Sequence, residues 1–166
     1  MAPPRIAWAV ERLDLASGYR VLEIGCGRGV ATRLICEAGA VVTGLDRSAT
    51  AIEAAVTRNA DLVAAGRASF HTTALETTDP GSARFDRILA VNVNLFWLDA
   101  ARGLATVRRL LAPAGRLHLV YDPPSPDRVE AIAAKLARNL AAAGFEIETL
   151  TAPSPGLLGL RAWVAA

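Results

Sequence analysis

The sequence predicts an α/β protein with a doubly wound, mostly parallel sheet of seven strands and an antiparallel hairpin at its C-terminal edge. Short apolar runs alternate with longer amphipathic segments, which is typical of repeated βαβ units. The first apolar run leads through a cluster of glycines into a helical pattern. The last two runs, 145–150 and 158–164, flank the turn-forming segment 153–156, which favours a hairpin.

Length and composition are those of one globular domain. The 166 residues are expected to form a single domain, 1–166, in which 1–16 make an N-terminal helix or lid. Hydrophobic residues make up 52% and charged residues 20%, so the chain can bury a substantial core. No apolar run approaches the ~20 residues that cross a bilayer, so no membrane association is expected.

Charge and cysteine content exclude some partners. The net charge is +2, and the basic residues are scattered rather than gathered into a stripe, so no nucleic acid is expected as a partner. Cys26 and Cys36 form neither a disulfide framework nor a metal-ligand spacing. We therefore expect a cytoplasmic protein without a metal, present as a monomer or homodimer.

The first half of the chain predicts a helix followed by alternating strands and helices. Ile6, Val10 and Leu13 share one face of a helix over 5–13. Gly39 is placed to end one later helix, and Ser48 to cap the next. The expected order is strand 19–24, helix 28–38, strand 40–45, helix 48–65 and strand 68–72.

The second half predicts a loop and then further alternation. Turn-forming residues make 77–84 a loop, and Ala114-Gly115 turns the chain into the fifth strand. Consecutive prolines in 122–126 exclude regular structure there. The expected order is strand 85–91, helix 98–111, strand 116–121, helix 127–143 and strands 145–150 and 158–164.

A glycine-rich turn joins the first strand to its helix. Gly25, Gly27 and Gly29 follow the apolar run directly, and glycines there let the backbone approach a ligand closely at a helix N-terminus. Asp46 ends the next strand, about 20 residues further on, where an acid can reach a pair of ribose hydroxyls. A tight strand-to-helix turn with a surface aspartate would give the same pattern.

The spacing of the glycines distinguishes two kinds of cofactor site. Dinucleotide folds have G-x-G-x-x-G, whereas this chain has G-x-G-x-G with Val30 at the last glycine position. Glu23 is a charged residue in a buried strand, where a side chain usually has a partner or a function. Residues 23–29 resemble motif I of class I S-adenosylmethionine-dependent methyltransferases, which have a Rossmann-like fold.

The resemblance extends over nearly the whole chain from about Ser17. Residues 85–93 resemble motif IV, and 108–119 resemble the helix-turn-strand element before the fifth strand. The resemblance implies S-adenosyl-L-methionine as cofactor, with S-adenosyl-L-homocysteine as product. It also implies a set of cofactor-binding residues: Glu23, Gly25, Cys26, Gly27, Gly29, Asp46, Arg47, Ala74, Leu75, Asn92 and Val93.

The same resemblance implies a role for each part of this set. The glycine turn would wrap the methionine moiety, with Glu23 orienting it and, directly or through water, the cofactor's ammonium. Asp46 would hold the ribose. Arg47 departs from the apolar residue usual in the family, and would stack on the adenine or point to solvent. Ala74-Leu75 stands where the family has an acid and an apolar residue, so the acid for the adenine amino group is absent.

Catalytic residues are harder to assign, because methyl transfer depends mainly on positioning and needs a base only when the acceptor is protonated. Many relatives place a histidine after motif IV, but this chain has Asn94-Leu95-Phe96-Trp97. Candidate catalytic residues are Asn92, Asn94, Tyr121 and Asp122, and candidate substrate-binding residues are Trp8, Phe96, Trp97 and Tyr121. The asparagines could instead satisfy backbone groups at a strand end, and the aromatic residues could pack in the core.

The expected function is methyl transfer from S-adenosyl-L-methionine to a small-molecule acceptor by in-line displacement. Two alternatives stay open. One is a non-catalytic or partner-dependent subunit that keeps the fold. The other is an enzyme of another reaction type on the same fold, such as a cyclase or dehydratase, because fold does not determine reaction.

Overall fold

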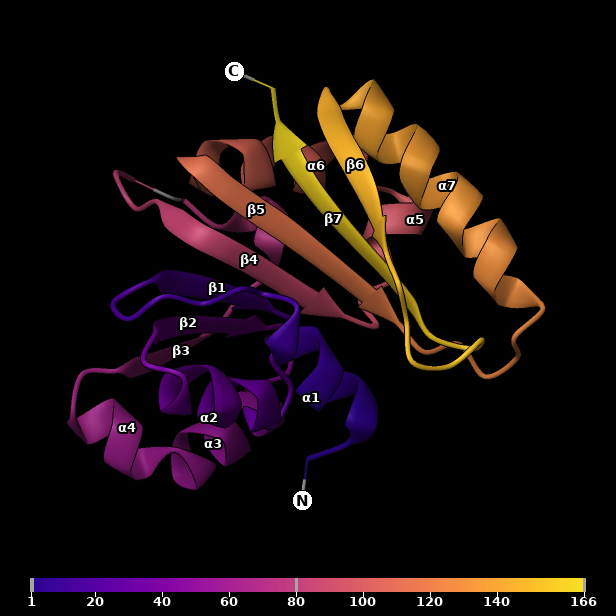
Figure 1. The fold of residues 1–166 in the computed structure, drawn as a ribbon. Coiled ribbons are helices and arrows are strands. Elements are labelled where there is room, and N and C mark those ends of the chain that lie inside the picture. Colours follow the sequence, from indigo (N-terminus) through magenta and orange to yellow (C-terminus); the bar gives the residue numbers. More distant parts are fainter. Residues whose placement is uncertain (1, 80, 166) are drawn as a thin grey trace.

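The computed structural model describes residues 2–79 and 81–165 as a seven-stranded sheet between two layers of helices (Figure 1). The strands are β1 (Arg20–Ile24), β2 (Val41–Asp46), β3 (Ala68–Thr72), β4 (Phe85–Val91), β5 (Leu111–Tyr121), β6 (Phe145–Leu150) and β7 (Leu158–Val164). The helices are α1 (Pro4–Glu11), α2 (Val30–Glu37), α3 (Ala49–Arg58), α4 (Ala60–Ala64), α5 (Leu95–Leu98), α6 (Ala101–Leu110) and α7 (Arg128–Ala142). A single 3₁₀ turn, η1 (Leu75–Thr77), follows β3.

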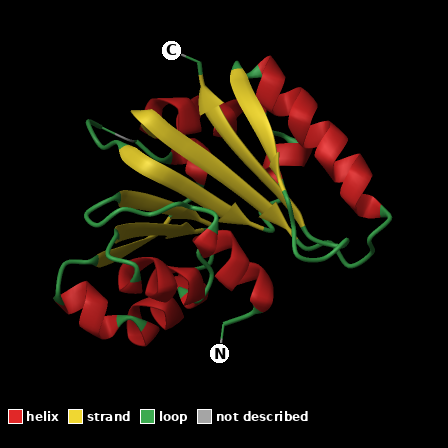
Figure 2. Ribbon diagram, viewed as in Figure 1, coloured by secondary structure: helices red, strands yellow, loops and turns green. Residues whose placement is uncertain are grey.

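The strand order is β3-β2-β1-β4-β5-β7-β6, which confirms the predicted doubly wound sheet. Strands β1 to β5 pair in parallel, and β7 runs antiparallel between β5 and β6 (Figure 2). The order therefore reverses between β1 and β4. Open α/β sheets bind ligands at the carboxyl ends of strands beside such a reversal.

Two apolar clusters hold the helices against the sheet. Successive residues of a strand face opposite sides, so β5 contributes to both clusters. Leu117 and Leu119 pack with residues of α6 and α7, whereas Val120 packs with residues of α1 and α2. The parallel strands are therefore covered on both faces, as their apolar runs predict. None of the helices within 2–79 and 81–165 is long and apolar enough to cross a membrane.

Two helices are shorter than the sequence predicts. Ser48 caps α3 as expected, accepting a hydrogen bond from the Ala51 N–H at 3.2 Å. The predicted helix 48–65 is broken at Asn59, whose backbone lies outside the helical region (φ −115°, ψ 27°). The predicted helix 98–111 begins only at Ala101, as α6, because the Asp99 backbone lies outside the helical region (φ −139°, ψ 77°). The short helix α5 before it was not predicted.

Strand β5 begins earlier than predicted, at Leu111 rather than Arg116. Its pairing with β4 shifts register between Phe85 and Arg87, which lets the expected turn at Ala114-Gly115 lie within the strand as an irregularity. Of the loop predicted over 77–84, residue 80 lies outside the described residues.

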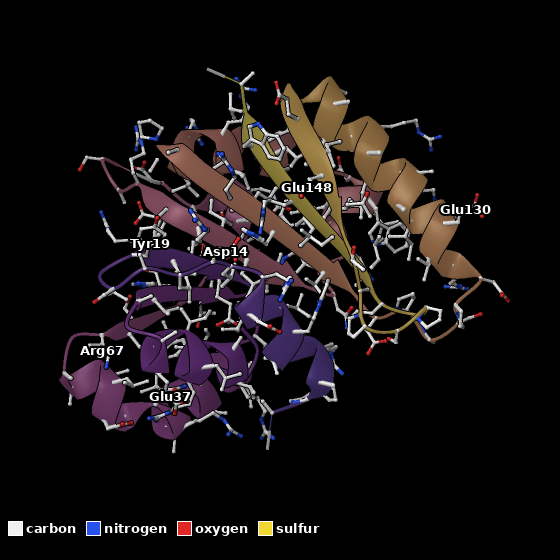
Figure 3. All side chains as sticks on the ribbon, viewed as in Figure 1. Asp14, Tyr19, Glu37, Arg67, Glu130 and Glu148 are labelled. Carbon is white, nitrogen blue, oxygen red and sulfur yellow. The ribbon has the colours of Figure 1, made fainter. Side chains whose placement is uncertain are left out.

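The segment from α1 to β1 is anchored to the strands at the C-terminal edge. Trp8 is buried with its indole over Gly159 of β7, so this candidate substrate-binding residue belongs to the core. Further along, Arg161 of β7 pairs with Asp14 at 2.5 Å and with Glu148 of β6 at 3.3 Å; both acids are labelled in Figure 3. One guanidinium therefore joins the N-terminal segment to β7 and β6.

A methyl group at Gly159 is expected to destabilise the protein. The Cβ of Gly159→Ala would collide with the Trp8 indole, and relieving such a clash in a packed core costs about 1–3 kcal/mol. Chemical denaturation measures this loss. Gly156→Ala is the control, because the nearest atom to its Cβ would be Pro126 Cγ at 4.0 Å. Equal midpoints for Gly159→Ala and the wild type would contradict this packing of Trp8.

Candidate active site

A cavity of about 480 Å³ opens at the carboxyl ends of the parallel strands, beside the reversal in strand order. Its walls are the segments that follow β1, β2, β3 and β4. It is lined by Ile24, Gly25, Leu45, Asp46, Arg47, Thr73, Ala74, Leu75, Glu76, Val93, Asn94, Leu95, Leu98 and Asp99. The sheet thus brings together predicted site residues from four separate segments of the chain.

The turn after β1 is left-handed at its three glycines. Gly25, Gly27 and Gly29 have φ values of 67°, 52° and 69°, which other residues rarely adopt. A Cβ at Gly25 would lie 2.7 Å from Cγ2 of Val93, on the segment after β4. The space around Gly27 is open, and its N–H donates to the Asp46 carboxylate at 2.9 Å. The glycines therefore form the turn between β1 and α2 that the sequence predicts.

Within the turn, Cys26 and Gly29 are buried, and neither lines the cavity. The Cys26 thiol lies next to Gly44 of β2. Burial, reinforced by the carboxylates of Glu23 and Asp46, raises the pKa of Cys26 far above its ordinary value. The thiol therefore stays protonated and is not a nucleophile.

Asp46 is held at the rim of the cavity by two backbone donors. The N–H groups of Gly27 and Ser48 each donate to one of its carboxylate oxygens at 2.9 Å. Each oxygen keeps a further lone pair, so the carboxylate can accept hydrogen bonds from a ligand as well. Arg47, the next residue, is exposed and lines the same cavity.

Glu23 lies directly beneath the turn and does not line the cavity. The residue is 5% exposed, and its carboxyl group accepts a hydrogen bond from the Thr32 hydroxyl of α2 at 2.6 Å. Burial raises the pKa of Glu23 to about 7, with a smaller contribution from Asp46, while hydrogen bonding from Thr32 opposes the rise. The side chain is therefore partly protonated at neutral pH.

The segment after β4 is held in place by the end of β5. Asn92 has a left-handed backbone (φ 57°), and its Oδ1 accepts a hydrogen bond from the Asp122 N–H at 2.8 Å. Tyr121 is buried and its hydroxyl donates to the Val93 carbonyl at 2.6 Å. Burial raises the pKa of Tyr121 well above its ordinary value, so this hydroxyl is not a base. Among the candidate catalytic residues, Asn94 is the one that lines the cavity.

The candidate aromatic residues after β4 also lie away from the cavity. Phe96 is fully buried in the cluster beneath α6 and α7. The Trp97 ring packs beside that cluster, with the Lys135 ammonium 5.4 Å from its centroid. Their positions agree with the alternative interpretation, in which these side chains seat the following helix on the sheet.

Several cavity residues were missed by the sequence analysis: Thr73, Glu76, Leu95, Leu98 and Asp99. Thr73 directly follows β3, a position that could have been found from the strand end alone. Glu76 lies on η1, two residues after the position where the acid is absent. These short elements have no periodicity that a sequence pattern could detect. Within the described parts of the chain, no cluster of His, Cys, Asp or Glu could hold a metal ion.

Comparison with known proteins identifies relatives along the segment that builds the cavity. The family described as "Methyltransferase domain" matches residues 21–115. O-methyltransferase cnsE of Penicillium expansum is 32% identical over 70% of this chain and 44% of its own length. A ubiquinone biosynthesis O-methyltransferase of Pseudomonas aeruginosa is 30% identical over 70% of this chain and 50% of its own length. The chain thus spans half or less of these two relatives.

A solved structure shares the fold along the whole chain. The crystal structure of ribosomal protein L11 methylase from Lactobacillus delbrueckii subsp. bulgaricus has a TM-score of 0.75 and 22% identity, and the match covers 98% of this chain and 78% of that one. The family match includes the glycine turn, Asp46 and every wall of the cavity. The chain therefore belongs to the class I, Rossmann-like family of S-adenosyl-L-methionine-dependent methyltransferases.

Proposed function

We propose that this chain transfers a methyl group from S-adenosyl-L-methionine to a small-molecule acceptor. The proposal rests on the cavity between the Gly25 turn and Asp46. This cavity combines apolar lining residues, a carboxylate and a glycine backbone that a ligand can approach closely. A nucleoside, with an apolar base and two ribose hydroxyls, needs these surfaces. The volume of about 480 Å³ also lies within the roughly 300–1,000 Å³ typical of small-molecule sites.

The adenosine part of the cofactor fits residues from three strand ends. Ile24, Leu45 and Leu75 line the cavity and are buried, so they would pack against the adenine. Asp46 would accept hydrogen bonds from the ribose hydroxyls through the lone pairs that Gly27 and Ser48 leave free.

Glu76 would replace the acid that is absent at Ala74. It lines the same wall of the cavity as Leu75, from the 3₁₀ turn after β3. Its carboxylate would accept a hydrogen bond from the exocyclic amino group of adenine, leaving the Leu75 N–H for the ring nitrogen. Arg47, which lines the cavity from the end of β2, would flank the adenine.

The glycine turn and its supports would hold the methionine part. The backbone of Gly25 and Gly27 can approach the ligand closely, and Val93 closes the opposite side. Glu23 would orient the turn from beneath, and its ionised form would favour the cofactor's ammonium. When bound, the cofactor supplies an electrophilic methyl group on a sulfonium, and the chain contributes mainly positioning.

The acceptor would enter at the segment after β4. Asn94 offers an amide there, and Leu98 is 64% exposed although it is large and apolar. Such a mouth suits a small acceptor with an apolar part and one hydrogen-bonding group. Both relatives described above are named O-methyltransferases, which supports an oxygen atom as the acceptor.

Calorimetry with S-adenosyl-L-methionine and S-adenosyl-L-homocysteine tests cofactor binding, and a labelled-methyl assay on small metabolites of the source organism tests transfer. Binding together with transfer is the expected result. Failure to bind either compound would overturn the proposal. Binding without transfer would favour a cyclase, a dehydratase or a partner-dependent subunit instead.

Loss of the Glu76 carboxylate is expected to remove a preference for adenine. The wild type should bind S-adenosyl-L-homocysteine at least about 10-fold more tightly than its analogue with purine in place of adenine, which lacks the amino group but keeps the ring-nitrogen acceptor, since a hydrogen bond to a charged group contributes about 1.5–3 kcal/mol. Glu76→Leu should bind the two with nearly equal affinity in calorimetry. Glu53→Leu, an exposed site on α3, is the control. A preference that survives in Glu76→Leu would assign the amino group to another residue.

Replacement of Glu23 is expected to change how the stability of the cofactor-free protein depends on pH. With a folded pKa of about 7 against an ordinary 4.5, the folded state binds more protons, so the wild type loses stability as pH rises through this interval. Glu23→Gln does not titrate. Its stability relative to the wild type should therefore rise by up to about 3 kcal/mol between about pH 4 and pH 8.

Chemical denaturation at a series of pH values measures this difference. Glu37→Gln, at an exposed position of α2, controls for the loss of one negative charge. If the stabilities of Glu23→Gln and the wild type followed parallel curves over the whole interval, the raised pKa of Glu23 would be refuted.

A further inference from the structure

Asn59 is a fully buried polar residue at the break between α3 and α4, and none of the roles proposed above uses it. Its Nδ2 donates two hydrogen bonds, to the Ala55 carbonyl at 2.9 Å and to the Gly29 carbonyl at 3.1 Å. The second bond crosses from the helix after β2 to the glycine turn after β1. It therefore connects two segments that both border the cavity.

The contact between Asn59 and Gly29 is close on both sides. A Cβ at Gly29 would lie 2.5 Å from Nδ2 of Asn59 and 3.1 Å from Cβ of Ala55. The absence of a side chain at Gly29 thus leaves room for the Asn59 amide and for α3. It also allows the left-handed φ of Gly29. The last residue of the turn is consequently packed directly on α3.

The amide oxygen of Asn59 indicates that this side chain does more than fill space in the core. The Asn59 Oδ1 is buried and has no hydrogen-bond partner among residues 2–79 and 81–165, a situation that costs about 1–3 kcal/mol. Rotating the amide by 180° would not remove this cost, because the amide oxygen would then face the carbonyl oxygens of Ala55 and Gly29. A leucine of similar size would avoid the cost, so the donor toward Gly29 is the feature that accounts for an asparagine here.

A second, weaker connection runs alongside. Arg33 of α2 pairs with Asp61 of α4 at 2.6 Å and donates to the Arg58 carbonyl at 2.9 Å. Asp61 is exposed, and exposed ion pairs contribute little to stability. The buried amide is therefore the contact that acts on the turn itself.

We infer that Asn59 is a positioning residue of the cofactor site, which keeps the glycine turn in its binding conformation through the Gly29 carbonyl. The inference rests on the proposed function, because it assumes that the turn holds the cofactor. With the bond in place, the turn is ordered before the ligand arrives. Without it, ordering the turn becomes part of the cost of binding.

The test compares two variants that each lose the hydrogen bonds of one buried side chain. Asn59→Leu removes the bonds to Gly29 and to Ala55. Thr106→Val removes the bond from the buried Thr106 hydroxyl to the Arg102 carbonyl, on α6. Cofactor affinity is measured by calorimetry with S-adenosyl-L-homocysteine, at a temperature at which both variants are folded.

Asn59→Leu is expected to raise the Kd about 10-fold or more, while Thr106→Val leaves it within about twofold of the wild type. With an acceptor in hand, Asn59→Leu should raise the KM for the cofactor and leave kcat at saturation nearly unchanged. Equal affinities for Asn59→Leu and the wild type would overturn the inference. A wild type that fails to bind would instead overturn the proposed function.

Hydrogen exchange gives a second measurement, which does not depend on a folded Asn59→Leu. In the cofactor-free wild type, the amides of Gly27 and Gly29 should exchange slowly, because they donate hydrogen bonds to the Asp46 carboxylate and to the Cys26 carbonyl in a turn that is already ordered. In Asn59→Leu, or in Asn59→Ala if the leucine does not fold, their exchange should become faster, whereas Thr106→Val should leave it unchanged. Fast exchange of these two amides in the wild type would contradict the inference.

Discussion

The hydrogen bond from the Gly27 N–H to the Asp46 carboxylate joins the ends of β1 and β2, and the geometry of the cavity depends on it. It requires a left-handed backbone at Gly27, which points the N–H toward the neighbouring strand. The same bond fixes the Asp46 carboxylate at the rim, together with the Ser48 N–H. One interaction therefore sets both the path of the turn and the direction of the acid.

Polar side chains, of which Tyr121 and Asn59 are buried, support the other parts of the cavity wall. Tyr121 holds the Val93 carbonyl, Asn92 joins the ends of β4 and β5, and Asn59 holds the Gly29 carbonyl. In each case a side chain fixes backbone atoms instead of facing the ligand. Such an arrangement suits methyl transfer, because precise placement of the two reactants can supply much of the rate enhancement.

These supports carry a cost in stability. The Glu23 carboxyl group is buried with a raised pKa, and the Asn59 Oδ1 has no hydrogen-bond partner in the described part of the chain. Buried polar groups of this kind destabilise a domain unless every hydrogen bond is made. Their concentration beneath one glycine turn agrees with the general observation that local rules are broken at functional sites and compensated elsewhere.

The sequence by itself determined the seven strands, their alternation with helices and the ligand-binding edge. Apolar runs and glycines act locally, and the carboxyl ends of parallel strands meet at one edge, so Gly25, Asp46, Leu75 and Val93 could be placed together. Element ends set by distant partners could not be predicted: α3 stops at Asn59, whose amide contacts a carbonyl 30 residues away.

Only the tertiary structure decided which side chains near that edge face the cavity. Tyr121 and Asn92 looked like catalytic candidates, but their polar atoms are bonded to the backbone of neighbouring segments. Phe96 is buried in the core, while Glu76 reaches the cavity from a turn without any sequence pattern. The direction of a side chain after a strand depends on the partners that packing brings to it, and those partners come from other parts of the chain.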